Sequence, residues 1–153
     1  MFEESGSCGI GVVIRNDRGI LMGAMSKKLD LPLGALEVEG KAFEEGILLA
    51  GDLGLGKIFL EGDAKLVTDA LAGCSSPPSS IQMIIGGIQR WSFNVQAWQV
   101  SHVGRTGNCA AHLMARNAKL VTDSVVLGRG YSTHHCLSIE QRCIWFGLCV
   151  QLI

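Results

Sequence analysis

The sequence predicts one α/β domain in which a mixed β-sheet carries helices on its faces. Two observations lead to this class: short β-branched segments joined by a turn open the chain, and helical spacing then alternates with short apolar segments. A third is size, because 153 residues, 48% of them hydrophobic, are enough to bury one core. The pattern covers residues 1–126, which we assign to the domain, whereas residues 127–153 form a C-terminal tail without a predicted place.

The first two elements are predicted to form a β-hairpin. Residues 9–15 read GIGVVIR, a short β-branched segment, and residues 16–19, NDRG, are typical of a turn. Residues 20–28, ILMGAMSKK, can then return as the second strand.

The next three elements alternate between helix and strand. Apolar residues recur on one helical stripe over residues 36–53, and Gly51 and Gly54 end the pattern. Residues 57–60 form an apolar run that predicts a strand. Residues 65–71 then have the spacing of a short helix.

The last regular elements follow a proline-containing loop at residues 74–80. Ser80 is predicted to cap a helix that carries four isoleucines at helical spacing. Residues 95–103 alternate as a partly buried strand, and Asn108 is predicted to open a helix that ends near residue 120.

Charge and composition exclude several classes of function. The formal net charge is −1, from 13 Lys and Arg against 14 Asp and Glu, so the chain lacks the overall basic field of a non-specific nucleic-acid or membrane-surface binder. No apolar run reaches the about 18 to 20 residues of a membrane span, and the amino terminus is too polar for a secretory signal. Six cysteines without paired spacing are expected to be reduced thiols of an intracellular protein.

One glycine-rich motif has the spacing of a phosphate-binding loop. Residues 51–57 read GDLGLGK, but Ile58 stands where that motif needs Ser or Thr. A predicted helix precedes the motif and a strand follows it, which is the reverse of the required context. The sequence therefore favours a plain helix-to-strand connection.

Carboxylates at the ends of predicted elements are the first candidates for chemistry. Glu37 and Glu39 stand at the start of the first helix, and Asp63 follows the third strand, at the edge where open α/β sheets place ligands. Such oxygens bind hard divalent cations such as Mg²⁺. A structural interpretation is equally good, because acidic residues also complement helix amino termini and cap helices.

A second group of polar residues follows the last predicted strand. The segment SHVGRTGN places His102, Arg105 and Asn108 at the strand end, and His112 follows one helical turn after Asn108. Each is commonly a surface residue when taken alone. Because separated segments of a helix-flanked sheet can meet at one edge, this group and the carboxylates are predicted to form one site.

Four blocks of sequence resemble, in order and spacing, the ribonuclease H-like domains that are common in plant genomes and often described as reverse-transcriptase-like. The blocks are GIGVVIRNDRG, LEVEGKAFEEGILLA, IFLEGDAKLVTDAL and VSHVGRTGNCAAHLMARNA, and the resemblance covers about residues 6 to 126. It implies a ribonuclease H fold, with a five-stranded mixed sheet flanked by helices. It also implies cleavage of RNA in RNA–DNA hybrids with two Mg²⁺ ions, for which Mn²⁺ can substitute.

The resemblance also implies roles for individual residues. Glu39 matches the helix glutamate and Asp63 matches the strand-end aspartate, the two expected metal ligands and catalytic carboxylates. His102 matches a mobile catalytic histidine that assists proton transfer or product release, and Asn108 matches a polar residue nearby. His112 completes the catalytic set where these enzymes commonly carry an aspartate, although a neutral imidazole supplies no negative charge.

The amino terminus departs from the family pattern. The family's first strand carries an aspartate that both metals share, but no aspartate occurs before Asp17 in this chain. Glu3 and Glu4 do not lie in an apolar strand pattern and are expected to be solvated. We therefore expect the first strand to be largely missing, as in an amino-terminally truncated member.

Three functions of different class follow from these observations. The first is an endonuclease of the ribonuclease H type; the second is a nucleic-acid-binding module without turnover; the third is a degenerate retroelement-derived domain or protein-interaction element. The expected partner is an RNA–DNA hybrid or another nucleic acid in the nucleus or cytoplasm, with no membrane and no small-molecule cofactor. The expected nucleic-acid contacts are Lys65, Arg105, Asn108 and Arg116.

Overall fold

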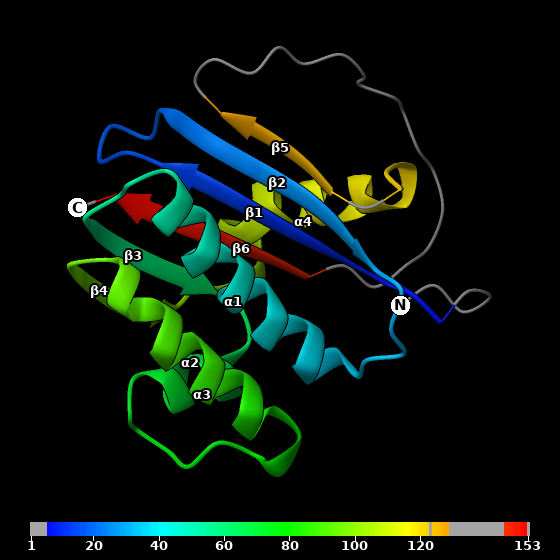
Figure 1. The fold of residues 1–153 in the computed structure, drawn as a ribbon, viewed down its shortest axis with the longest axis vertical. Helices are drawn as coiled ribbons and strands as arrows, with labels where there is room; N and C mark the ends of the chain where they lie inside the picture. The colour runs from blue at the N-terminus through cyan, green and yellow to red at the C-terminus, as the bar shows by residue number, and fades with distance from the viewer. Residues whose placement is uncertain (1–5, 123, 129–145, 153) are drawn as a thin grey trace.

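The computed structural model describes residues 6–122, 124–128 and 146–152, in which a six-stranded β-sheet lies between helices (Figure 1). The strands are β1 Cys8–Arg15, β2 Leu21–Leu29, β3 Lys57–Gly62, β4 Ala97–His102, β5 Ser124–Gly128 and β6 Phe146–Leu152. The α-helices are α1 Ala35–Asp52, α2 Lys65–Leu71, α3 Gln82–Trp91 and α4 Cys109–Asn117. The short 3₁₀ turns are η1 Ser79–Ile81, η2 Ser92–Asn94, η3 Arg105–Asn108 and η4 Ala118–Leu120.

The predicted hairpin is confirmed, because β1 and β2 pair antiparallel. Asn16 stabilises the turn: its Oδ1 accepts hydrogen bonds from the backbone N–H groups of Arg18 and Ile20, at 3.0 and 2.8 Å. Gly19 follows with a φ of 74°, a left-handed conformation that glycine adopts at little cost. Turn chemistry therefore determines where the second strand begins.

The sheet is mixed, with the strand order β4-β3-β6-β1-β2-β5. β3 and β4 run parallel, while β2 pairs antiparallel with both β1 and β5. β6 lies in the middle of the sheet, parallel to β1 and antiparallel to β3 (Figure 1). The sheet thus has six strands where five were expected. The sequence pattern predicts neither β5 nor β6, because short apolar runs without alternation carry no strand period.

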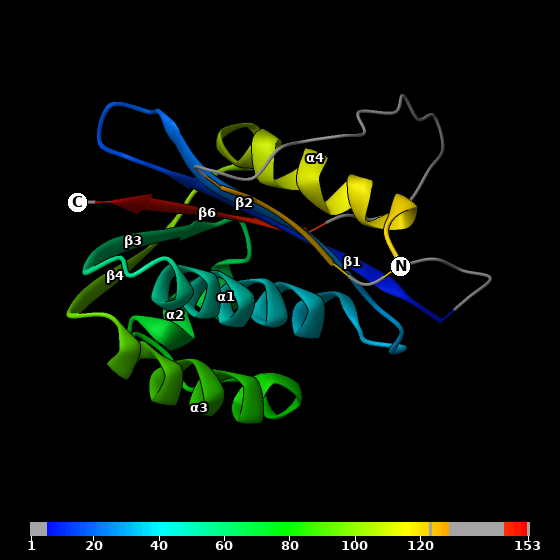
Figure 2. The ribbon, with the colours of Figure 1, turned by 45° about the horizontal axis from the view of Figure 1, so that its top comes forward.

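Helices cover both faces of the sheet. Figure 2 shows α1, α2 and α3 on one face and α4 on the other. The core between α1 and the sheet contains fully buried side chains of both layers, among them Phe43, Ile47, Ile10, Ile14, Ile58 and Leu60. Within the described parts of the chain, no helix combines the length and hydrophobicity that a membrane crossing requires.

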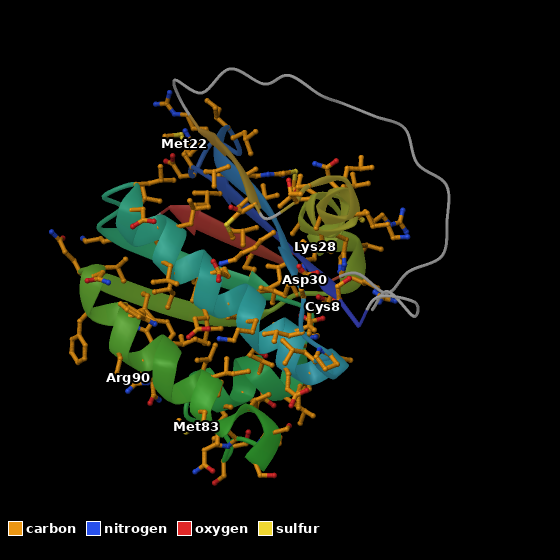
Figure 3. The ribbon with its side chains drawn as sticks, turned by 45° about the vertical axis from the view of Figure 1, so that its right-hand side comes forward. Cys8, Met22, Lys28, Asp30, Met83 and Arg90 are labelled. Atoms are coloured by element: carbon orange, nitrogen blue, oxygen red, sulfur yellow. The ribbon has the colours of Figure 1, made fainter. Side chains whose placement is uncertain are left out.

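Helix α3 packs on α1 and exposes its outer side, where Met83 and Arg90 lie (Figure 3). The prediction that Ser80 caps this helix is wrong. Ser79–Ile81 form the turn η1, and α3 begins at Gln82 without a side-chain cap. The 3₁₀ turn satisfies part of the backbone hydrogen bonding at the helix start, so a side-chain cap is not needed there.

The glycine-rich segment 51–57 is a helix-to-strand connection, as the sequence favours. α1 ends at Asp52, Gly54 adopts a left-handed φ of 68°, and β3 begins at Lys57. A phosphate-binding loop would open a helix at this point. The motif therefore has no phosphate-binding context.

Helix α4 lies directly on the backbone of β1. A Cβ atom at Gly11 would lie 2.1 Å from the Ala111 carbonyl oxygen and 2.2 Å from the Ala115 nitrogen, so only glycine permits this approach. A second contact comes from β2, where the buried Ser26 Oγ donates to the Met114 carbonyl oxygen at 2.5 Å. These contacts fix the helix relative to the strands.

Candidate active site

Asp63 is the centre of a polar cluster at one edge of the sheet. It follows β3 directly, and the parallel neighbour β4 ends at the same edge, where Gly62 pairs with His102. The Val103 N–H donates to the Gly62 carbonyl oxygen at 3.0 Å and continues the pairing beyond the strand. This topology brings the segment after β4 next to Asp63, although some 40 residues separate them in sequence.

Both carboxylate oxygens of Asp63 face polar groups from this segment. Asn108 Nδ2 donates to Oδ1 at 3.0 Å, and His112 Nε2 lies 3.2 Å from Oδ2. Arg105 Nε lies 3.8 Å from Oδ2, and His102 Nε2 lies 3.2 Å from the backbone oxygen of Asp63. The cluster is therefore built on one carboxylate and four donors or imidazoles.

The members of the cluster differ in their access to solvent. Asn108 is 1% exposed, and the side chains of Asp63 and His112 are 11% and 14% exposed. Arg105, by contrast, has 72% of its side chain exposed. The inner residues are thus protected by packing, whereas the Arg105 side chain lies on the solvent-exposed side of the cluster.

Glu39 supplies a second carboxyl group from α1. It is 6% exposed, and its Oε2 has no hydrogen-bond partner among the described residues. Burial raises the pKa of Glu39 to about 8, the negative charge of Asp63 adds to this effect, and Arg105 opposes it. An unpartnered buried carboxyl oxygen near a second carboxylate fits a divalent cation, which would favour the charged form.

Glu37 has the structural role that the sequence left open. Its Oε2 accepts a hydrogen bond from the Gly34 N–H at 2.5 Å, at the amino terminus of α1. The two neighbouring acidic residues of α1 therefore have different roles: Glu37 stabilises the helix start, and Glu39 is buried near Asp63.

The remaining predicted contacts lie around the cluster rather than in it. Lys65 stands two residues after Asp63, is exposed, and bonds to Asp69 at 2.8 Å within α2. Arg116 is exposed on the last turn of α4, four residues after His112.

The described residues contain no group of three or more His, Cys, Asp and Glu side chains arranged to hold a metal ion. Glu39 and Asp63 are the carboxyl groups that the site offers. β6, the strand next to β3, has the sequence FGLCVQL and so contains no acidic residue.

The sequence does not predict the bond between Asn108 and Asp63. An asparagine before a helix normally predicts a cap, but here the structure has no side-chain cap, and the amide turns to Asp63 instead. The close approach at Gly11 does have a sequence signal, because glycine inside a strand often marks contact with another backbone.

The sequence profile of a family described as "Reverse transcriptase-like" matches residues 2–118. A comparison with curated proteins finds no match. Among solved structures, RNase H1 from the halophilic archaeon Halobacterium salinarum is similar, with a TM-score of 0.68, 21% identity, and coverage of 72% of this chain and 84% of that one.

A second similar structure is the N-terminal RNase H domain of a Mycobacterium tuberculosis protein, determined as a fusion with maltose-binding protein. Its TM-score is 0.56, with 16% identity and coverage of 73% of this chain and 90% of that one. Membership of the plant group, a retroelement origin and truncation stay predictions, as do the domain boundary at residue 126 and the roles of the site residues. The profile match shows that the chain belongs to the reverse-transcriptase-like family, and the structural similarity shows that its fold is that of a ribonuclease H domain.

Proposed function

We propose that this domain binds nucleic acid and hydrolyses the RNA strand of RNA–DNA hybrids as a Mg²⁺-dependent endonuclease. The observation that carries the proposal is Glu39, whose buried Oε2 lies near Asp63 and has no hydrogen-bond partner within the part of the chain that the structure describes. A buried carboxyl group in this state is costly unless a proton or a cation neutralises it. A site that keeps such a group next to a second carboxylate is well suited to binding a cation.

Glu39 and Asp63 are the residues that would hold Mg²⁺, or Mn²⁺ in its place. When bound, a divalent cation would activate the attacking water and stabilise charge at the leaving oxygen. His102 lies at the rim of the site, with Nε2 near the Asp63 backbone oxygen, where it can accept or release a proton in exchange with solvent. His112 and Asn108 hold the Asp63 carboxylate from the α4 side.

Arg105 is the best-placed phosphate contact. Its side chain is largely exposed beside Asp63, so its guanidinium can reach the phosphates of a bound nucleic acid. Lys65 and Arg116 are exposed on flanking helices and are proposed as weaker contacts, since Lys65 is already paired with Asp69. We also infer that the domain acts inside the cell, in the nucleus or the cytoplasm, without a membrane or a small-molecule cofactor.

A second function, nucleic-acid binding without turnover, is favoured by one observation. β6 stands beside β3 without an acidic residue, so the described site has carboxyl groups only on α1 and after β3. Two carboxylates can hold one hard cation but give two cations few shared ligands. The test must therefore separate binding from cleavage.

The test uses a labelled RNA–DNA hybrid with Mg²⁺ and compares the parent chain with Asp63→Asn and Asp52→Asn. Asp52 is an exposed residue at the far end of α1 and is the matched control for charge removal. Cleavage that is lost in Asp63→Asn and kept in Asp52→Asn supports the endonuclease. Cation-dependent binding without cleavage supports the second function, and a parent chain that neither binds nor cleaves refutes both.

A further inference from the structure

We propose that Asn108 is a positioning residue for the Asp63 carboxylate and does not contact nucleic acid. The first evidence is burial, because Asn108 is only 1% exposed and so cannot present its amide to a phosphate at the surface. The second is its bond, since Nδ2 donates to Asp63 Oδ1 at 3.0 Å. The amide thus acts on bound nucleic acid through Asp63 rather than by direct contact.

The Asn108 amide is held in a fixed place relative to the sheet. Asn108 ends the turn η3, which the bond from the Gly107 N–H to the Gly104 carbonyl oxygen closes at 2.9 Å. It stands directly before α4, whose backbone lies against Gly11 of β1 and accepts a hydrogen bond from Ser26 of β2. A bond from this rigid unit to the end of β3 ties two separate elements together.

Fixing one oxygen of Asp63 also fixes the other. A carboxylate that is bonded only through solvent rotates about its last side-chain bond, whereas a bond to Oδ1 at 3.0 Å sets the plane of the group. Oδ2 is then directed to the side where His112 and Arg105 lie. Asn108 on Oδ1, together with His112 on Oδ2, therefore sets the orientation in which the carboxylate meets a cation or a substrate.

This inference rests on the proposed cation site, because the orientation of Asp63 matters only if that carboxylate binds something. Residues that orient a metal ligand typically contribute about 10-fold to 100-fold to metal affinity. We expect Asn108→Ala to weaken Mn²⁺ binding by about 10-fold or more. Binding of the hybrid in the presence of a chelator should stay within about 2-fold of the parent, since no phosphate contact is removed.

The experiment compares the parent chain, Asn108→Ala and Arg105→Ala by Mn²⁺ titration and by hybrid binding with a chelator present. Arg105→Ala is the control for a true nucleic-acid contact, and it should weaken hybrid binding without a cation. Unchanged Mn²⁺ affinity in Asn108→Ala would overturn the inference. A loss of chelator-resistant hybrid binding as large as that of Arg105→Ala would overturn it as well.

A second measurement covers the case in which Asn108→Ala does not fold. The side-chain amide resonances of Asn108, recorded by ¹⁵N NMR without a cation, should shift in Asp63→Ala and stay unchanged in Asp52→Asn. Resonances that do not respond to Asp63→Ala would refute the positioning role. If the parent chain binds no Mn²⁺, the cation part of the proposed function fails, and the amide resonances alone decide whether Asn108 orients Asp63.

Discussion

Replacing Gly11 with alanine tests how the site is held together. The new Cβ would lie 2.1 Å from the Ala111 carbonyl oxygen, and the nearest atoms all belong to the backbone of α4. Ordinary van der Waals contact begins near 3.4 Å, so the helix must retreat by about 1 Å or more, because backbone cannot swing aside as a side chain can. Such overpacking typically costs about 1 to 3 kcal/mol, and we expect the upper end of that range.

For a chain of this length, that cost corresponds to a melting temperature lower by about 6 to 12 °C. The same retreat would lengthen the bonds from Asn108 and His112 to Asp63, now 3.0 and 3.2 Å, beyond hydrogen-bonding range. Both effects can be measured, by thermal unfolding followed with circular dichroism and by the Asn108 amide resonances.

Gly86→Ala is the matched control, because nothing lies within 4 Å of a Cβ at that position on α3. There alanine should stabilise the helix by about 0.5 to 1 kcal/mol. If Gly11→Ala has the melting temperature of the parent chain and its Asn108 amide resonances are not shifted, α4 does not pack against Gly11 as described.

Three further predictions concern other parts of the fold. Ser26→Ala removes the hydrogen bond to the Met114 carbonyl oxygen and should cost about 1 kcal/mol in a denaturant titration; an unchanged midpoint would mean that the bond contributes nothing. Because the pKa of Glu39 is raised from 4.5 to about 8 in the folded state, the folded chain retains a proton that the unfolded chain releases, so stability should fall as pH rises through this window. Glu39→Gln cannot titrate and should flatten that part of the melting-temperature profile; parallel profiles for the two chains would contradict the buried carboxyl group. Glu61→Cys should form a disulfide with its register partner Cys149 under mild oxidation, because paired antiparallel Cα atoms lie about 4.5 to 5.5 Å apart. Peptide mass spectrometry would detect the disulfide, and the same chain with Cys149→Ser is the control. If no disulfide forms, the observed register of β6 is wrong.

Local sequence patterns predict the helices and strands that have a clear hydrophobic period and clear turn residues at their ends. The hairpin, α1, β3, α2, β4 and α4 appear in the expected order, because each combines its own period with its own turn or breaker residues. The same patterns place Asp63 at the end of β3 and His102 at the end of the neighbouring β4. The two residues meet because parallel strands end at one edge of the sheet.

The features that the sequence does not predict all depend on contacts between distant residues. Nothing local in FGLCVQL says that this segment pairs with β1 and β3. The Asn108 amide could cap its own helix, and only the approach of Asp63 from β3 gives it a better acceptor. Ser80 similarly has the chemistry of a cap, but a 3₁₀ turn takes the place of the cap.

The central place of β6 has a consequence for how the protein is made. β1 and β3 are connected in the sheet only by β6, which begins at Phe146. The sheet therefore becomes continuous only after this segment has been synthesised and has emerged from the ribosome. Until then each of the two strands presents an open edge of unpaired backbone groups, which are prone to pair with other chains. Pairing across so long a stretch of chain is also slow. The yield of soluble protein during expression is therefore expected to depend strongly on synthesis rate and chaperone supply.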